Sequence, residues 1–212
     1  NKIMKSYKNE PLKIEMPVPN GNYEVTLTIK AHEDTVYTVL SQSRRFIRVD
    51  ESISSGETRD IVFNASVCDY HKSGEEYTKV EYAQIYILCD GAVTATAAVS
   101  PVDIPTVFIA GDSTVTDQPA EYPYVPSETY CGWGQALQGL LKPGIAVSNH
   151  AQSGSHTKEF LAVNWTAFKD KIKQGDVLIC EFGHNDQKLE ELAAFGGYAD
   201  NLRYMVNYAK ER

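Results

Sequence analysis

The sequence predicts a two-part β plus α/β protein, with an antiparallel β-sandwich over residues 1–103 and part of a parallel-sheet α/β/α unit over residues 104–212. Three observations predict this fold class. Short segments in the first hundred residues alternate apolar and polar side chains, with turn residues between them. From residue 106 onwards, continuous apolar runs alternate with helical periodicity, which is typical of a parallel sheet buried on both faces. The length of 212 residues also favours two modest domains, at roughly 150 residues per domain.

The alternating segments define the expected strands of the first part. Residues 23–30 (YEVTLTIK) place apolar side chains at every second position and follow the turn cluster 19–22. Further strands are expected at 35–40, 46–49, 61–67, 83–88 and 93–99. Because no convincing helix lies between them, an antiparallel sandwich is favoured. The sequence leaves open whether this part only packs and positions its neighbour or binds carbohydrate.

The second part alternates strands with helices. Its expected strands are 106–110 (TVFIA), 145–148 and 176–182 (DVLICEF), and its expected helices are 133–141, 158–173 and 199–209. This order predicts a parallel, doubly wound sheet.

Composition excludes two classes of partner. The chain has 20 Lys and Arg against 28 Asp and Glu, a net charge of −8, and contains no run of basic residues. Nucleic acid and anionic membranes are therefore not expected partners. No segment approaches the roughly 18 consecutive apolar residues of a membrane span. Of the four cysteines, Cys68 and Cys89 are compatible with either a disulfide or buried free thiols.

Polar, glycine-containing loops follow each of the three apolar strands of the second part. These loops are 111–114 (GDST), 149–155 (NHAQSGS) and 183–186 (GHND). Because the carboxyl ends of parallel strands meet at one edge of a sheet, we expect the three loops to face the same rim.

The residue types in these loops indicate acyl transfer. A serine at a strand-to-helix turn, Ser113, can expose its hydroxyl as a nucleophile. The backbone N–H groups of Ser113 and Gly154 and the side-chain amide of Asn185 can form an oxyanion hole. Each loop alone is more often structural, and their order after successive strands is what favours catalysis.

These motifs resemble the SGNH or GDSL hydrolases, and specifically their rhamnogalacturonan acetylesterase branch. The strings that carry the resemblance are 108–118 (FIAGDSTVTDQ), 132–135 (GWGQ), 152–154 (QSG) and 182–188 (FGHNDQK). In the first part, 19–27 (PNGNYEVTL) and 43–45 (SRR) resemble the galactose-binding-like sandwich often fused to these esterases.

The resemblance implies a serine-dependent O-acetylesterase that acts through an acyl-enzyme on acetylated pectic polysaccharide, without metal or cofactor. Ser113 would be the nucleophile, Gly154 and Asn185 would complete the oxyanion hole, and Asp112 would shape the turn. His184 would support its loop or border the substrate. A polymer substrate implies action outside the cell, although an intracellular role on imported oligosaccharides remains open.

Two departures from the family pattern qualify this prediction. Where the branch shows an Arg after Gly154, this chain has Ser155 and His156, and His156 would either contact an acidic sugar or be a solvated loop residue. The family also supplies its base from an Asp-x-x-His, which is absent from these 212 residues. The expectation is that the sequence is the N-terminal portion of a larger esterase. The alternatives are an esterase for acetylated xylan or a small ester, and a base-less carbohydrate-binding module.

Overall fold

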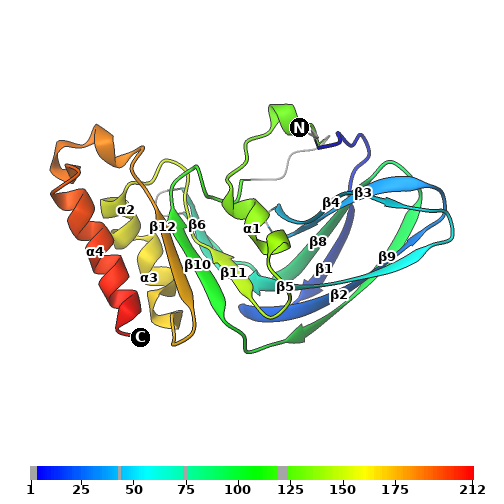
Figure 1. The fold of residues 1–212 in the computed structure, drawn as a ribbon, viewed down its shortest axis with the longest axis horizontal. Helices are drawn as coiled ribbons and strands as arrows, with labels where there is room; N and C mark the ends of the chain where they lie inside the picture. Colours follow the sequence, from blue (N-terminus) through cyan, green and yellow to red (C-terminus); the bar gives the residue numbers. More distant parts are fainter. Residues whose placement is uncertain (1–3, 43, 74–75, 119–123) are drawn as a thin grey trace.

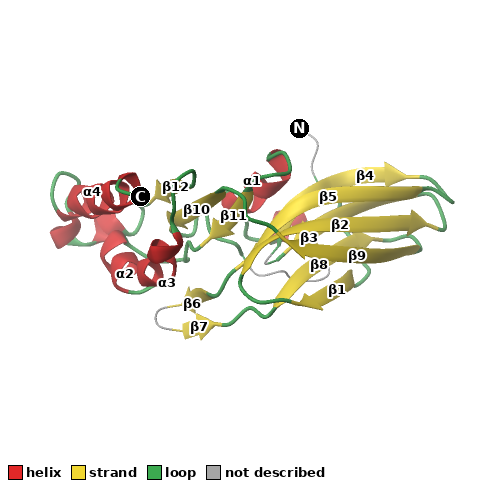
Figure 2. Cartoon of the chain, turned by 90° about the horizontal axis from the view of Figure 1, so that it is seen from below, coloured by secondary structure: helices red, strands yellow, loops and turns green. Residues whose placement is uncertain are grey.

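The computed structural model describes residues 4–42, 44–73, 76–118 and 124–212 (Figure 1). Ser43, one of the residues that carry the N-terminal resemblance, lies outside this set. The described chain contains antiparallel sheets, one parallel sheet and several helices (Figure 2). None of the described helices is both long and apolar enough to cross a membrane.

Two larger antiparallel sheets make up most of the first hundred residues. One has the strand order β1-β8-β3-β4 and the other the order β5-β2-β9. The bounds of these strands are β1 Leu12–Pro17, β2 Gly21–Ala31, β3 Thr35–Ser41, β4 Arg45–Ile53, β5 Thr58–Val67, β8 Tyr82–Cys89 and β9 Val93–Pro101. A short hairpin of β6 (Tyr70–Ser73) and β7 (Glu76–Thr78) forms a further sheet.

The two larger antiparallel sheets share one hydrophobic core. The alternation of β2 points Val25, Leu27 and Ile29 inward, where they join Val39 of β3 and Ile87 of β8 in one buried cluster. Thus the period-two pattern that predicts strand 23–30 also selects the side chains that hold the sheets together.

The second half of the chain is built on a parallel sheet with the strand order β11-β10-β12. Its strands are β10 (Thr106–Gly111), β11 (Ala146–Asn149) and β12 (Val177–Glu181). The helices are α1 (Gly134–Leu140), α2 (Thr157–Ala162), α3 (Asn164–Phe168) and α4 (Gly197–Lys210). Short 3₁₀ turns lie at Pro126–Glu128, Lys169–Lys171, Asp186–Lys188 and Glu190–Leu192.

Alternate residues of β10 face opposite sides of the parallel sheet. Phe108 and Ala110 pack against α2, α3 and α4. Val107 and Ile109 pack on the other face, toward α1. Helices therefore cover both faces of this sheet (Figure 1).

Buried contacts join the antiparallel sheets to the parallel sheet. Arg45, the first residue of β4, donates to Val147 O of β11 at 2.9 Å and forms an ion pair with Asp117. Helix α1 lies against β4, since a Cβ added at Gly139 would be 2.4 Å from Phe46 O. The glycine thus permits the close approach of helix and strand.

The structure confirms the expected parallel sheet and every expected strand, with small shifts of the ends. The expected helix 158–173 is divided into α2, α3 and a 3₁₀ turn. The break between α2 and α3 lies at Val163, whose backbone has a φ of −116° and a ψ of −74°, away from regular helical values. The strands β1, β6 and β7 were not expected. Cys68 and Cys89 are free thiols, which decides between the two alternatives for this pair.

Candidate active site

The three loops that follow β10, β11 and β12 meet at one rim of the parallel sheet, as expected. Gln118 of the first loop donates through Nε2 to Ser153 Oγ of the second loop at 3.1 Å. Asn185 of the third loop donates through Nδ2 to Ser155 O of the second loop at 2.9 Å. Hydrogen bonds between the loops therefore hold the predicted site residues in one region.

Ser113 lies in a tight turn directly after β10. The buried Asp112 side chain accepts hydrogen bonds from Thr114 N at 3.0 Å and Thr114 Oγ1 at 2.9 Å, and Asp112 O accepts from Thr116 N at 3.2 Å. Asp112 thus shapes the turn. Ser113 itself is partly exposed, and neither its hydroxyl nor its N–H bonds to another described residue. Both groups are therefore available to a ligand.

Gly154 and Asn185 present the other two predicted oxyanion donors. Gly154 is exposed with a φ of +83°, a conformation that favours glycine, and its N–H bonds to no other residue in the described ranges. The Asn185 side chain is buried, and its Oδ1 accepts from Lys188 Nζ at 2.9 Å. An amide carries two N–H donors, and within the described ranges Asn185 uses one of them, on Ser155, so the second can serve a ligand. Their joint action on an oxyanion stays a prediction.

The two histidines predicted to border the substrate differ in their local roles. His184 is exposed, and its carbonyl accepts from Gln187 Nε2 at 3.2 Å. His156 immediately precedes α2, and its Nδ1 accepts from Glu159 N at 3.2 Å. His156 thus caps the helix, which leaves Nε2 as the ring atom that can face a substrate. Substrate contact stays a prediction for both residues.

Within the described chain, no histidine or carboxylate is hydrogen-bonded to the Ser113 hydroxyl. His150 lies within the second rim loop but is buried, with its ring stacked on Phe168 at a centroid distance of 4.2 Å. Burial lowers the pKa of His150 to about 3, so it is a poor proton acceptor near neutral pH. His32 pairs with Thr94 in the antiparallel part, far along the chain from the rim loops.

Glu181 and Trp133 are site residues that sequence reasoning missed. Glu181 ends β12, and its two oxygens accept hydrogen bonds from Thr114 Oγ1 at 2.8 Å and from Trp133 Nε1. Thr114 follows Ser113 directly, so this arrangement lies beside the nucleophile. The signal in the sequence was the tryptophan between the two glycines of 132–135, which served only for the resemblance.

A buried ion pair fixes the segment that follows the first loop. Asp117 Oδ2 accepts from Arg45 Nε at 2.7 Å, and Asp117 Oδ1 accepts from Asn149 Nδ2 at 2.9 Å. Burial raises the pKa of Asp117, while the Arg45 guanidinium opposes that rise.

The third loop is supported by Tyr198, whose hydroxyl donates to Phe182 O at 2.9 Å where this loop begins. Burial raises the pKa of the Tyr198 hydroxyl.

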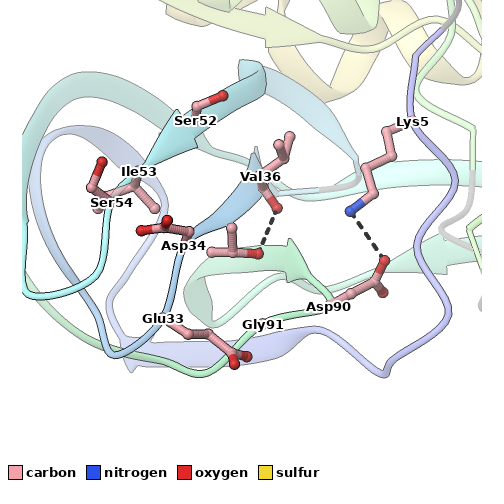
Figure 3. Close-up of a pocket in the computed structure, with 10 residues that line it drawn as sticks. Lys5, Glu33, Asp34, Val36, Ser52, Ile53, Ser54, Asp90 and Gly91 are labelled. Carbon is pink, nitrogen blue, oxygen red and sulfur yellow. Dashed lines mark hydrogen bonds and ion pairs between the residues drawn. The ribbon is translucent and has the colours of Figure 1, made fainter.

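A separate hollow of about 670 Å³ lies in the antiparallel part, away from the rim loops (Figure 3). Its acidic residues already bind the local backbone: Asp34 accepts from Ser55 N and Glu33 accepts from Ala92 N, while Lys5 pairs with Asp90 at 3.1 Å. These carboxylates tie loops together, and the rim of the parallel sheet remains the candidate active site.

Comparison with known proteins supports the resemblance. No family model matches the chain. A curated relative, rhamnogalacturonan acetylesterase RhgT of Bacillus subtilis (strain 168), is 38% identical over 108 residues, which are 50% of this chain and 44% of the relative. The chain therefore spans less than half the length of the curated relative it matches, and the resemblance to this kind of esterase is confirmed.

Solved structures align with the chain at low sequence identity and with TM-scores below 0.5. The crystal structure of protein YxiM from Bacillus subtilis aligns with 94% of this chain and 53% of its own, at 22% identity and a TM-score of 0.48. A family two carbohydrate esterase from Clostridium thermocellum, in complex with cellohexaose, aligns with 97% of this chain and 69% of its own, at 12% identity and a TM-score of 0.32.

Proposed function

We propose that this chain is the nucleophile-bearing part of a serine-dependent carbohydrate O-acetylesterase that removes acetyl groups from a pectic polysaccharide of the rhamnogalacturonan type. One observation carries the proposal: among the described residues, nothing bonds to the hydroxyl or N–H of Ser113, which lies on the rim where Gly154 and Asn185 also have N–H donors without a described partner. The similarity to RhgT, whose name states this activity, supports the substrate class.

In the proposed reaction, Ser113 Oγ attacks the carbonyl carbon of the acetyl ester while its proton passes to a base. The oxyanion that forms is held by the N–H groups of Ser113 and Gly154 and by the amide of Asn185, donors worth roughly 2.7–4 kcal/mol each. The sugar hydroxyl leaves with the proton, and the acetyl group remains on Ser113. Water then hydrolyses this acyl-enzyme and releases acetate.

The base is the component to be identified. Serine is a weak nucleophile without a neighbouring base, and these 212 residues contain no Asp-x-x-His. Activity must therefore be tested on the full polypeptide that the gene encodes.

The two parts of the chain have different roles in this esterase. Residues 104–212 form the portion of the SGNH-type hydrolase domain that carries Ser113, and residues 1–103 form a galactose-binding-like sandwich domain. The shared core of the two larger antiparallel sheets supports the sandwich. A polymeric substrate favours a site of action outside the cell.

The test is acetate release by the full polypeptide from acetylated rhamnogalacturonan, acetylated xylan and a small acetyl ester. We expect release from rhamnogalacturonan to be the fastest and to be lost in Ser113→Ala. Ser127→Ala is the control, since Ser127 is an exposed serine of the 3₁₀ turn Pro126–Glu128, outside the three rim loops. Preference for xylan would change the substrate, whereas full activity in Ser113→Ala would refute the mechanism. A second function, carbohydrate binding without catalysis, would be supported if the polypeptide bound the polymer but released no acetate.

A further inference from the structure

We propose that Trp133 and Glu181 form a binding subsite beside Ser113 for a neutral pyranose ring of the substrate. The proposal rests on the esterase function proposed above and adds to it a residue pair that recognises the sugar.

Trp133 combines a partly exposed side chain with polar atoms that are all hydrogen-bonded. Trp133 is 43% exposed, although all three of its polar atoms have protein partners. Its N–H donates to Thr114 O at 2.9 Å, its carbonyl accepts from Ala136 N at 3.0 Å, and Nε1 donates to Glu181. A partly exposed aromatic side chain whose polar edge is fixed is suited to stack on the C–H face of a sugar ring.

The neighbouring glycines hold Trp133 against the loop that carries the nucleophile. A Cβ at Gly132 would lie 2.3 Å from Thr116 O, and a Cβ at Gly134 would lie 2.3 Å from Val115 O. Only glycine allows this approach of two backbones. Trp133 is thereby held next to the turn that contains Ser113.

Glu181 adds a polar partner and a charge to this subsite. Its carboxylate has about four lone-pair sites. Among the described residues, Thr114 and Trp133 occupy two of these sites, so Glu181 can accept further hydrogen bonds from sugar hydroxyls. The same negative charge repels a ring that carries its own carboxylate. The subsite therefore favours a neutral sugar ring over a uronate. When the acetyl group is on a uronate, Ser113 would attack that ester while the adjacent neutral ring of the polymer stacks on Trp133.

Intrinsic fluorescence can test the subsite without any ester hydrolysis. The chain has two tryptophans, and Trp165 is buried, so solvent-sensitive emission reports on Trp133. The Ser113→Ala protein is titrated with a xylo-oligosaccharide and with an oligogalacturonate of equal length. We expect the neutral probe to shift the emission and to bind at least tenfold more tightly than the charged probe.

Three variants test whether the emission change comes from the subsite. Trp133→Phe should remove the emission change. Glu181→Gln should lower the ratio of the Kd for the charged probe to the Kd for the neutral probe at least fivefold. Tyr130→Ala is the matched control, because Tyr130 is an 84% exposed aromatic on the same connection, and it should leave the titration unchanged. An emission change that persists in Trp133→Phe, or equal binding of both probes, would overturn the proposal.

A kinetic comparison in the full polypeptide separates sugar recognition from a structural role. Trp133→Ala should lower kcat/KM for an acetylated oligosaccharide at least tenfold more than kcat/KM for a small acetyl ester, mainly through KM. Equal losses on both substrates would show that Trp133 only supports the loop, and would overturn the subsite while leaving the esterase function intact. Saturable binding of the neutral probe without any acetate release would instead sustain the subsite and refute the proposed function.

Discussion

Arg45 Nε lies 2.7 Å from Asp117 Oδ2, and this buried ion pair joins strand β4 of the antiparallel part to the loop that carries Ser113. Asp117 in turn accepts from Asn149, where β11 ends. The position of the nucleophile loop therefore depends on a residue from the other part of the chain. If residues 1–103 were removed, the loop that carries Ser113 would not be expected to keep its position.

Replacing Arg45 should destabilise the protein strongly. Arg45→Met leaves Asp117 as a buried carboxylate without its cation, which costs about 3–5 kcal/mol. Urea denaturation measures the loss. Arg48→Met is the control, since the Arg48–Glu51 pair is about one-third exposed and such pairs contribute about 0–1 kcal/mol. Similar losses in both variants would argue against a special role for the buried pair, as would a failure of Asp117→Asn to offset part of the Arg45→Met loss.

His150 should make the protein less stable in acid. Because burial lowers its pKa to about 3, while the unfolded value is about 6.5, the unfolded chain binds the extra proton between these two values. The free energy of unfolding should therefore fall as the pH is lowered from about 6.5 toward about 3, with a contribution of up to about 1.4 kcal/mol per pH unit.

The His150→Phe variant isolates this contribution. Phe keeps the stack on Phe168 but cannot bind a proton, so the variant should show a flatter dependence of unfolding free energy on pH. His32→Gln, at an exposed histidine, should keep the wild-type slope. Identical slopes in wild type and His150→Phe would contradict the assignment.

Removing the Asn185 amide should strongly lower kcat. Asn185→Ala removes one oxyanion donor, so kcat for acetate release by the full polypeptide should fall about 10²–10³-fold with little change in KM. Gln187→Ala changes an exposed amide two positions away and serves as the control. The oxyanion role would not survive if both variants lost activity equally, or if the loss in Asn185→Ala were confined to KM.

Adding a side chain at Gly134 should destabilise the protein. A Cβ there would approach Val115 O to 2.3 Å, so Gly134→Ala requires backbone movement and should cost about 1–3 kcal/mol. In Gly21→Ala the nearest atom to the new Cβ is 3.6 Å away, which is ordinary contact, and thermal unfolding should show little change. Equal midpoints for the two variants would disprove the tight packing of 132–134 on the nucleophile loop.

The sequence was sufficient to predict the elements whose side chains repeat regularly and the rim on which the loops meet. The alternation in β2 and the apolar run of β10 arise from burial, which leaves its pattern in the residues themselves. Strand β1 escaped prediction because it is at the edge of its sheet and only two of its six residues are even partly buried. In addition, Pro11, Pro17 and Pro19 mark its surroundings as a turn.

The contacts between distant segments could not be predicted in this way. Arg45 and Asp117 are 72 positions apart, and nothing in the local pattern of either residue indicates its partner. The same holds for Trp133 and Glu181, which are 48 positions apart. Such pairs depend on how the sheets and α1 pack, which the periodicity of a single segment does not contain.

The central claim is that Ser113 carries the acetyl group during the reaction. The most direct measurement is rapid acid quenching of the full polypeptide during turnover of a small acetyl ester, followed by mass spectrometry of its peptides. The account predicts a transient acetyl group on the peptide containing Ser113, and none in Ser113→Ala. An acetyl group on another residue, or steady turnover in Ser113→Ala, would contradict it.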